Sequence, residues 1–124
     1  MARKQSLTLT EAELPVMVAL WEKSPASVGD VAETVGKERA VAYNTVLTIL
    51  RILERKGYVR HTKDGRAFLY QPTVGRGQAQ RTAVRQLLAR FFENSPELLM
   101  VNLLRDENID AREIERLKKL VENE

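Results

Sequence analysis

The sequence predicts a mainly α-helical protein with one small β-hairpin and a separate helical region at its C-terminal end. Apolar residues recur at helical spacing along most of the chain, and two short runs rich in aromatic and β-branched residues flank Asp64-Gly65. The character of the sequence changes at Gly75-Arg76-Gly77, which we interpret as a hinge. A chain of 124 residues suffices for one domain with an appendage. We therefore expect a first domain over residues 1–74 and a helical region over residues 75–124.

The composition excludes several functional classes. The chain has no cysteine and only one histidine, so it cannot form disulfides, thiolate metal sites or iron–sulfur clusters, and His-rich metal sites have little material. No apolar run approaches the roughly 18 residues of a membrane span. The start of the chain also lacks the apolar core of a secretory signal. We expect a cytoplasmic protein without a cofactor, a bound metal or a membrane-inserted segment.

The first helix is predicted to begin near Thr10. Thr10 and Glu13 have the spacing of a capping box, in which each side chain accepts a hydrogen bond from the backbone of the other residue. Pro15 forfeits one backbone hydrogen bond inside such a helix, so a start at Pro15 is the alternative. We interpret Trp21 as core packing rather than as a platform for a ligand. The apolar positions that follow helical spacing are Leu14, Met17, Val18 and Trp21.

A second helix is predicted from the capping signal at Ser27 and Asp30. We expect Gly36 to end this helix in the left-handed conformation that glycine favours. Residues 37–39 are then expected to form a tight polar turn, and a third helix follows over residues 40–56 without a breaker. The apolar stripe of the second helix consists of Val28, Val31, Ala32 and Val35.

The third helix has two faces of different chemistry. The predicted inward face consists of branched apolar residues: Val46, Ile49, Leu50 and Leu53. The opposite face carries amide, hydroxyl and guanidinium groups: Asn44, Thr48, Arg51 and Arg55, flanked by Thr45 and Ile52. Amide and guanidinium groups can form two hydrogen bonds to a base edge in the major groove, and threonine can bond a base or touch a thymine methyl group. We interpret this face as a base-reading surface, and an ordinary solvated surface is the alternative.

A β-hairpin is predicted directly after the third helix. Gly57 is expected to cap that helix, Asp64-Gly65 to form a two-residue turn, and Pro72 to end the second strand. Lys63 and Arg66 lie at the tip, where they can reach phosphate groups. The order helix, helix, turn, helix, hairpin is that of a winged helix-turn-helix.

Positive charge is concentrated in the middle of the chain. Residues 37–66 carry eight basic and three acidic side chains, whereas residues 93–124 carry five basic and nine acidic ones. The basic segment is a candidate phosphate-facing surface, and a solvated basic face is the alternative. The candidate DNA-binding residues are Tyr43, Asn44, Thr45, Thr48, Arg51, Arg55, Lys56, His61, Lys63 and Arg66.

The last fifty residues contain more apolar surface than they can bury by themselves. Three amphipathic helices are predicted, the second capped by Ser95 with Pro96 behind it and the third by a capping box of Asp110 and Glu113. A second copy of the chain would cover this surface, and packing onto residues 1–74 is the alternative. A two-fold dimer would read a palindrome. The candidate dimerisation residues are Leu87, Leu88, Phe91, Phe92, Leu98, Leu99, Val101, Leu103, Leu104, Ile114, Leu117 and Val121.

Several motifs are typical of one family. They are Leu-Thr-Glu-Ala-Glu-Leu at 9–14, Leu-Trp-Glu at 20–22, Ala-Tyr-Asn-Thr-Val at 42–46, Lys-Gly-Tyr at 56–58 and Tyr-Gln-Pro at 70–72. With these motifs the chain resembles the penicillinase-repressor family, the BlaI/MecI/CopY type, and the resemblance continues more loosely to Glu124. It implies a homodimeric winged-helix transcriptional repressor that binds inverted repeats with TACA/TGTA-like half-sites. It also implies a C-terminal dimerisation region of three helices.

By matching position, the resemblance implies that Asn44, Thr45 and Thr48 read bases and that Arg66 belongs to the wing. Ile52 stands where the family often has arginine, and Arg51 precedes it. This departure leaves the pattern of base contacts open.

The resemblance also bears on how the repressor is released. The absence of cysteine excludes the copper-sensing mode of some family members. In the antibiotic-sensing branch, a membrane sensor-protease system triggers cleavage between an asparagine and a phenylalanine of the dimerisation region. Asn102 and Leu103 occupy the matching place. Proteolytic release is therefore a hypothesis, with such a sensor-protease system as a partner.

Other classes of function find less support. The carboxylates of the chain have no partner histidine or glycine-rich loop near them, so we expect no enzyme. His61 falls in a predicted wing strand, where contact with water or phosphate is expected rather than general base catalysis. A winged helix that binds proteins would favour a hydrophobic or acidic third-helix face. Release by a small ligand stays open, because an apolar pocket leaves no simple signature in a sequence.

Overall fold

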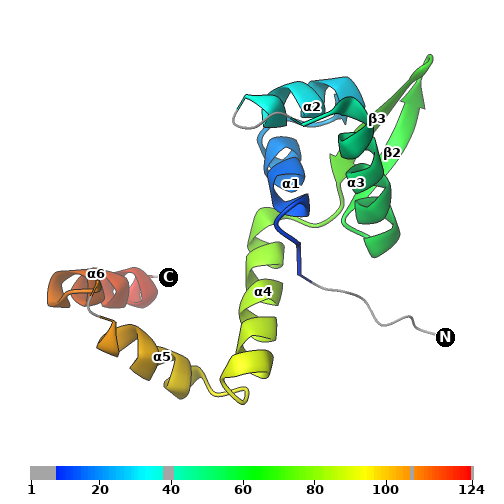
Figure 1. The fold of residues 1–124 in the computed structure, drawn as a ribbon. Coiled ribbons are helices and arrows are strands. Elements are labelled where there is room, and N and C mark those ends of the chain that lie inside the picture. Colours follow the sequence, from blue (N-terminus) through cyan, green and yellow to red (C-terminus); the bar gives the residue numbers. More distant parts are fainter. Residues whose placement is uncertain (1–7, 38–40, 107, 124) are drawn as a thin grey trace. The chain divides into compact units, whose positions relative to one another are not determined.

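The structure is a computed structural model that describes residues 8–37, 41–106 and 108–123 (Figure 1). The chain divides into two compact units, Met1–Val84 and Arg85–Glu124. None of the helices in the described ranges is both long and apolar enough to cross a membrane. The turn expected at residues 37–39 falls mostly outside the described residues.

The described residues up to Val74 form three helices and a β-hairpin, as the sequence predicts (Figure 1). The helices are α1 (Glu13–Glu22), α2 (Val28–Gly36) and α3 (Tyr43–Lys56), and the hairpin strands are β2 (Val59–Asp64) and β3 (Ala67–Pro72). The predicted fold class, mainly α with a winged helix-turn-helix, is confirmed. A short strand, β1 (Ala26–Ser27), pairs antiparallel with β3 and gives the sheet order β1-β3-β2. Sequence reasoning missed it because two residues show no alternation.

The reciprocal hydrogen bonds of both predicted capping boxes are present, and those of Thr10 and Glu13 span the turn that leads into α1, whose first residue is Glu13. The Thr10 hydroxyl accepts from the Glu13 N–H at 3.2 Å, and a Glu13 carboxylate oxygen accepts from the Thr10 N–H at 2.9 Å. Ser27 and Asp30 make the same reciprocal pair at the start of α2. Pro15 therefore lies inside the first helix and does not begin it.

The core of the first unit lies between α1, α2, α3 and the base of the sheet. Its most buried side chains are Val16, Met17, Leu20, Val31, Val46, Leu50 and Leu53. The buried face of α1 differs from the predicted one, because Leu14 is 46% exposed and Val16 and Leu20 are buried instead. Helix α1 is apolar nearly all round, so spacing alone does not select its inner face. Trp21 packs against the core, as predicted, and its indole N–H donates to the Val74 carbonyl at 2.9 Å.

Two of three predictions about glycine and turn geometry need correction. Gly57 ends α3 in the left-handed conformation with φ 87°, as expected. Gly36 does not adopt it, because α2 includes Gly36 and continues in right-handed geometry through Lys37. The hairpin turn lies one residue later than predicted, since Asp64 pairs with Ala67 and the loop is Gly65-Arg66. Gly65 has φ 64° at the first loop position, where a II′ turn requires glycine.

The segment interpreted as a hinge is the start of a helix. Helix α4 (Arg76–Phe91) begins there, and the Ala79 N–H donates to the Gly75 carbonyl at 3.0 Å. The remaining helices are α5 (Pro96–Arg105) and α6 (Ala111–Glu122). Both begin at the predicted caps, Ser95 for α5 and the capping box of Asp110 with Glu113 for α6.

Candidate nucleic-acid interface

Helix α3 has the two faces that its sequence predicts. Val46, Leu50 and Leu53 are fully buried, and Ile49 is partly buried against the same core. Asn44, Thr45, Thr48, Arg51 and Arg55 are all exposed. The outward face therefore presents one amide, two hydroxyl and two guanidinium groups on a helix whose opposite side is fixed by apolar packing.

The first turns of α3 hold the shorter polar groups. The Thr48 hydroxyl donates to the Asn44 carbonyl at 3.0 Å, so its own hydrogen is directed along the helix and its oxygen lone pairs face outward as acceptors. Tyr43 is 54% exposed at the first position of the helix. A Cβ atom built on Gly29 would lie 4.0 Å from the Tyr43 ring, so this ring packs beside the start of α2.

The hairpin carries the second group of candidate residues. Strands β2 and β3 pair antiparallel from Val59 with Pro72 to Asp64 with Ala67. Lys63 is exposed near the end of β2, and Arg66 is exposed in the turn. Both cations therefore extend from the tip of a two-stranded ribbon that the core holds only at its base.

His61 connects the hairpin to α3. Its Nδ1 atom lies 2.9 Å from both carboxylate oxygens of Glu54, and its ring centroid lies 4.9 Å from that of Phe68. The centroid of the His61 ring also lies 5.4 Å from that of Tyr70. The pKa of Tyr70 is raised by burial and, less strongly, by the Glu54 charge. His61 thus binds a carboxylate of α3 from within the wing.

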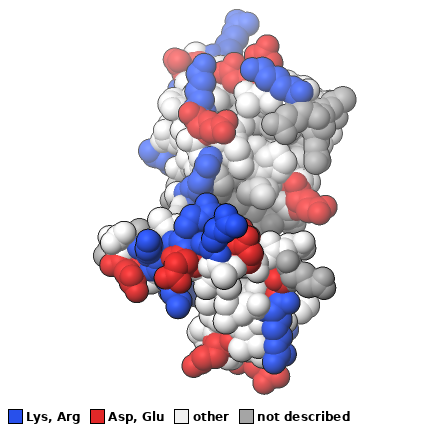
Figure 2. Space-filling model, turned by 90° about the vertical axis from the view of Figure 1, so that its left-hand side faces the viewer, with Lys and Arg blue, Asp and Glu red and all other residues white. Residues whose placement is uncertain are grey.

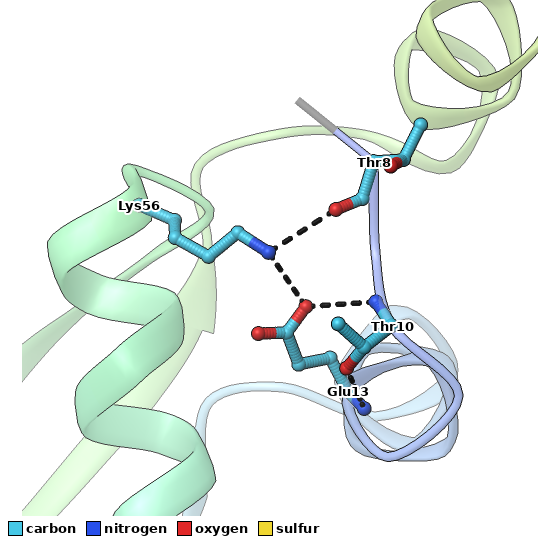
Figure 3. Close-up of polar contacts among 4 residues, drawn as sticks. All are labelled: Thr8, Thr10, Glu13 and Lys56. Carbon is cyan, nitrogen blue, oxygen red and sulfur yellow. Dashed lines mark hydrogen bonds and ion pairs between the residues drawn. The ribbon is translucent and has the colours of Figure 1, made fainter. Parts of the chain in front are cut away.

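Lys56 faces the interior and not the surface predicted to meet DNA. Its Nζ atom lies 2.7 Å from Oε1 of Glu13 and donates to the Thr8 carbonyl at 3.1 Å (Figure 3). The side chains of Lys56 and Glu13 are only 12% and 7% exposed. Because its ammonium group is held by α1 and the segment before it, we remove Lys56 from the candidate DNA contacts.

The position of Lys56 around the helix axis already indicates that it lies away from the outward face of α3. At about 100° per residue, Arg55 lies about 20° from Asn44 around the helix axis, whereas Lys56 lies about 120° away, on the flank. Sequence analysis predicted neither the Glu13–Lys56 ion pair nor the Glu54–His61 contact of α3. The first joins residues 43 positions apart in the sequence, and such a separation has no periodic pattern.

Basic and acidic charges are mixed on the surface that faces the viewer in Figure 2. Among the described residues, no group of three or more His, Cys, Asp or Glu side chains is placed to hold a metal ion.

Most of the candidate dimerisation residues are exposed, and Leu88, Phe92, Leu99 and Ile114 are half-buried. Among the described residues of α5 and α6 none is buried, and Phe91, Leu104, Leu117 and Val121 are 50% exposed or more. A groove of about 480 Å³ lies between α5 and α6 and is lined mainly by apolar side chains, including Leu103, Leu104, Ile114, Leu117 and Val121.

The chain is similar to known proteins over most of its length. The model of one family, described as penicillinase repressor, matches residues 9–123. The chain is 27% identical over 114 residues to the penicillinase repressor of Bacillus licheniformis, and the match covers 92% of this chain and 89% of that protein.

Two solved structures resemble the first unit. One is the solution structure of the DNA binding domain of the repressor BlaI, with a TM-score of 0.54 and 30% identity; it covers 61% of this chain and 93% of the other. The second is the monomeric form of Bacillus licheniformis BlaI in complex with the blaP half-operator. Its TM-score is 0.50 at 31% identity, and the match covers 57% of this chain and 87% of the other.

Proposed function

The chain belongs to the penicillinase repressor family, and from this premise we propose that it is a transcriptional repressor that binds operator DNA as a homodimer in the cytoplasm. The observation that carries the proposal is the outward face of α3, where Asn44, Thr48, Arg51 and Arg55 stand exposed opposite a fully buried apolar stripe. Support comes from the similarity to a BlaI domain in complex with a half-operator.

In this proposal α3 enters the major groove and reads base edges. The Asn44 amide pairs with adenine through two hydrogen bonds, and Thr45 and Thr48 bond a base or contact a thymine methyl group. Arg51 and Arg55 reach guanine or phosphate from the later turns of the helix. Tyr43 is exposed at the first position of the helix, about 100° around the axis from Asn44, and contacts DNA from the flank of this face.

The wing supplies contacts to the phosphate backbone. Lys63 and Arg66 are exposed at its tip, and positive charge there attracts DNA of any sequence. His61 sets the wing against α3 through Glu54, so its role is to hold the two DNA-facing elements together.

The C-terminal helices form the dimer interface of the proposed repressor. Their exposed apolar side chains are better covered by a second copy than by water, because apolar burial is favourable by roughly 25 cal/mol per Å². A two-fold axis then places two copies of α3 about 34 Å apart, one turn of DNA, which matches an inverted repeat.

We propose proteolysis between Asn102 and Leu103 as the release step. Both residues are exposed, and α5 has no buried residue. In the monomer that is in equilibrium with the proposed dimer, a helix with so little burial opens locally at small cost, which gives a protease access to its backbone. A membrane sensor-protease system is the proposed partner.

Mass spectrometry of the repressor from penicillin-treated and untreated cells tests the release step. The expected result is a fragment ending at Asn102 in treated cells only. Asn102→Asp should suppress the fragment, whereas the matched change Asn108→Asp in the following loop should not. Release without a shorter chain would favour a small ligand instead, for which the groove between α5 and α6 has a suitable volume.

The proposed function is tested by titrating the full chain onto two DNA duplexes of equal length. One carries an inverted repeat of TACA/TGTA half-sites and the other a scrambled sequence. We expect the inverted repeat to bind at least about a thousandfold more tightly, with affinity falling steeply as salt rises. Equal affinity for both duplexes, and for the DNA upstream of its own gene, would contradict the proposal.

A further inference from the structure

The Glu13–Lys56 pair is built differently from a surface ion pair. A single carboxylate oxygen of Glu13, Oε1, accepts both from the Thr10 N–H at 2.9 Å and from the Lys56 ammonium at 2.7 Å (Figure 3). The same ammonium donates to the Thr8 carbonyl. The capping box of α1 is therefore continued by charge-assisted hydrogen bonds to the last residue of α3.

Lys56 lies where the two DNA-facing elements meet. Gly57 follows it as the left-handed cap, and the Tyr58 N–H donates to the Leu53 carbonyl at 2.9 Å. Thr73, just after β3, holds the same junction through its hydroxyl, which donates to the Gly57 carbonyl at 2.7 Å. The end of α3 and both ends of the hairpin thus share one anchoring point.

The electrostatics of the junction agree with this geometry. Burial raises the pKa of Tyr58, and the negative charge of Glu13 raises it further. The Lys56 ammonium lies 5.8 Å from the centre of the Tyr58 ring. Glu13 and Lys56 therefore act on the first residues of the wing as well as on α3.

Stability alone is a weak reason for such a pair. The cost of removing two charges from water offsets much of their attraction, so a buried ion pair contributes little net free energy to folding. Apolar packing through Val46, Leu50 and Leu53 already attaches α3 to the core. That packing has no directional preference, whereas charge-assisted hydrogen bonds fix position and angle.

We infer that Glu13 and Lys56 are positioning residues, which fix the position and angle of α3 and of the wing relative to α1. Through this placement they set how strongly the protein prefers operator DNA to other DNA. The inference rests on the proposed function. Helix α3 is about 20 Å long, so a tilt of about 5° about its C-terminal end moves Asn44 by about 2 Å. A displacement of that size breaks a base-edge hydrogen bond while leaving the phosphate contacts of the flexible cations in reach.

The test uses the full chain and the two duplexes described above. The double variant Glu13→Gln/Lys56→Met removes both charges without leaving one of them buried and unpaired, and its amide oxygen still accepts from Thr10. The matched control is Lys63→Gln, which removes one exposed cation from the wing. For each protein, thermal unfolding, both dissociation constants and the salt dependence of binding are measured.

We expect the double variant to unfold cooperatively and to bind the inverted repeat about tenfold more weakly. Its affinity for the scrambled duplex and its salt dependence should stay within error of the wild type. Lys63→Gln should weaken both duplexes alike and lower the salt slope by about 0.9. An unchanged ratio between the two duplexes in the double variant overturns the inference. A uniform loss with a reduced salt slope overturns it too, because Lys56 would then be a phosphate contact.

Lys56→Arg decides the question if the double variant does not fold. Arginine keeps the charge, so a phosphate contact retains both its affinity and its salt slope. A positioning residue loses discrimination, because the wider, planar guanidinium places its donors at other positions and angles than the compact ammonium does. Retained discrimination overturns the inference. Wild-type protein that binds both duplexes equally would instead reject the proposed function.

Discussion

The two units of the molecule bury their apolar residues to very different degrees. Among the described residues of the first unit, seven apolar side chains are less than 2% exposed, and helices α1, α2 and α3 close around them. In α5 and α6 no described residue is buried, although the sequence there is as strongly patterned. Apolar periodicity therefore predicts which face of a helix is apolar, but it does not predict what covers that face. The first unit completes its core within the chain, whereas α5 and α6 leave apolar side chains exposed, which the proposed dimer would cover.

The largest expected effect is on self-association. Leu117→Asp places a carboxylate in the apolar groove between α5 and α6, and in a symmetric dimer the change occurs twice. Each substituted copy should reduce the free energy of association by at least about 2 kcal/mol, so the dimer should be weakened by at least about 4 kcal/mol. Sedimentation equilibrium measures this loss. Arg116→Asp, on the same helix but outside the groove, is the control and should leave association nearly unchanged.

A core substitution in the first unit should behave in the opposite way. Leu50 is fully buried, so Leu50→Ala should lower the free energy of unfolding by about 2–5 kcal/mol at every protein concentration. Leu104 is 50% exposed, so Leu104→Ala should destabilise only through the loss of dimer. Urea unfolding at several concentrations separates the two cases. A concentration-independent loss for Leu104→Ala would show that the second unit has its own closed core.

The same contrast explains what the sequence could predict. Caps were predicted correctly at Thr10, Ser27, Ser95 and Asp110 because each cap joins residues three positions apart, and local geometry alone decides it. The outward face of α3 was predictable because residues one helical period apart share a face, so the spacing alone separates the buried side from the exposed one.

Features that depend on distant residues were not predictable in this way. The Glu13–Lys56 pair joins positions 43 apart, and the two-residue strand β1 exists only because β3 lies beside it. Gly36 and Gly57 both come after the apolar stripe of a helix, yet of these two glycines only Gly57 is left-handed. The Gly57 cap leads directly into β2, and the next backbone hydrogen bonds of the chain tie Tyr58 to Leu53 and Thr73.

The reading of individual bases should depend on side chains of the first unit. Asn44→Ala should reduce the preference for the inverted repeat by about 1–3 kcal/mol while leaving self-association unchanged. Arg66→Ala is the matched comparison, because it removes an exposed wing cation and should weaken both duplexes equally. Binding titrations on both duplexes measure the two effects. Equal losses on both duplexes for Asn44→Ala would show that this residue does not read bases.

The smallest expected effects come from two glycines of the first unit that have opposite backbone geometry. Neither has an atom within 4 Å of an added Cβ, so packing does not distinguish them. Gly57 has φ 87°, which a side chain adopts only with strain, so Gly57→Ala should destabilise by about 1 kcal/mol. Gly36 is the last residue of α2 and is right-handed, so Gly36→Ala should stabilise by about 0.5–1 kcal/mol. Thermal unfolding would show opposite shifts of the midpoint, and neither change should alter dimerisation. If Gly36→Ala destabilises the protein instead, this result would support the left-handed conformation that the sequence predicted for Gly36.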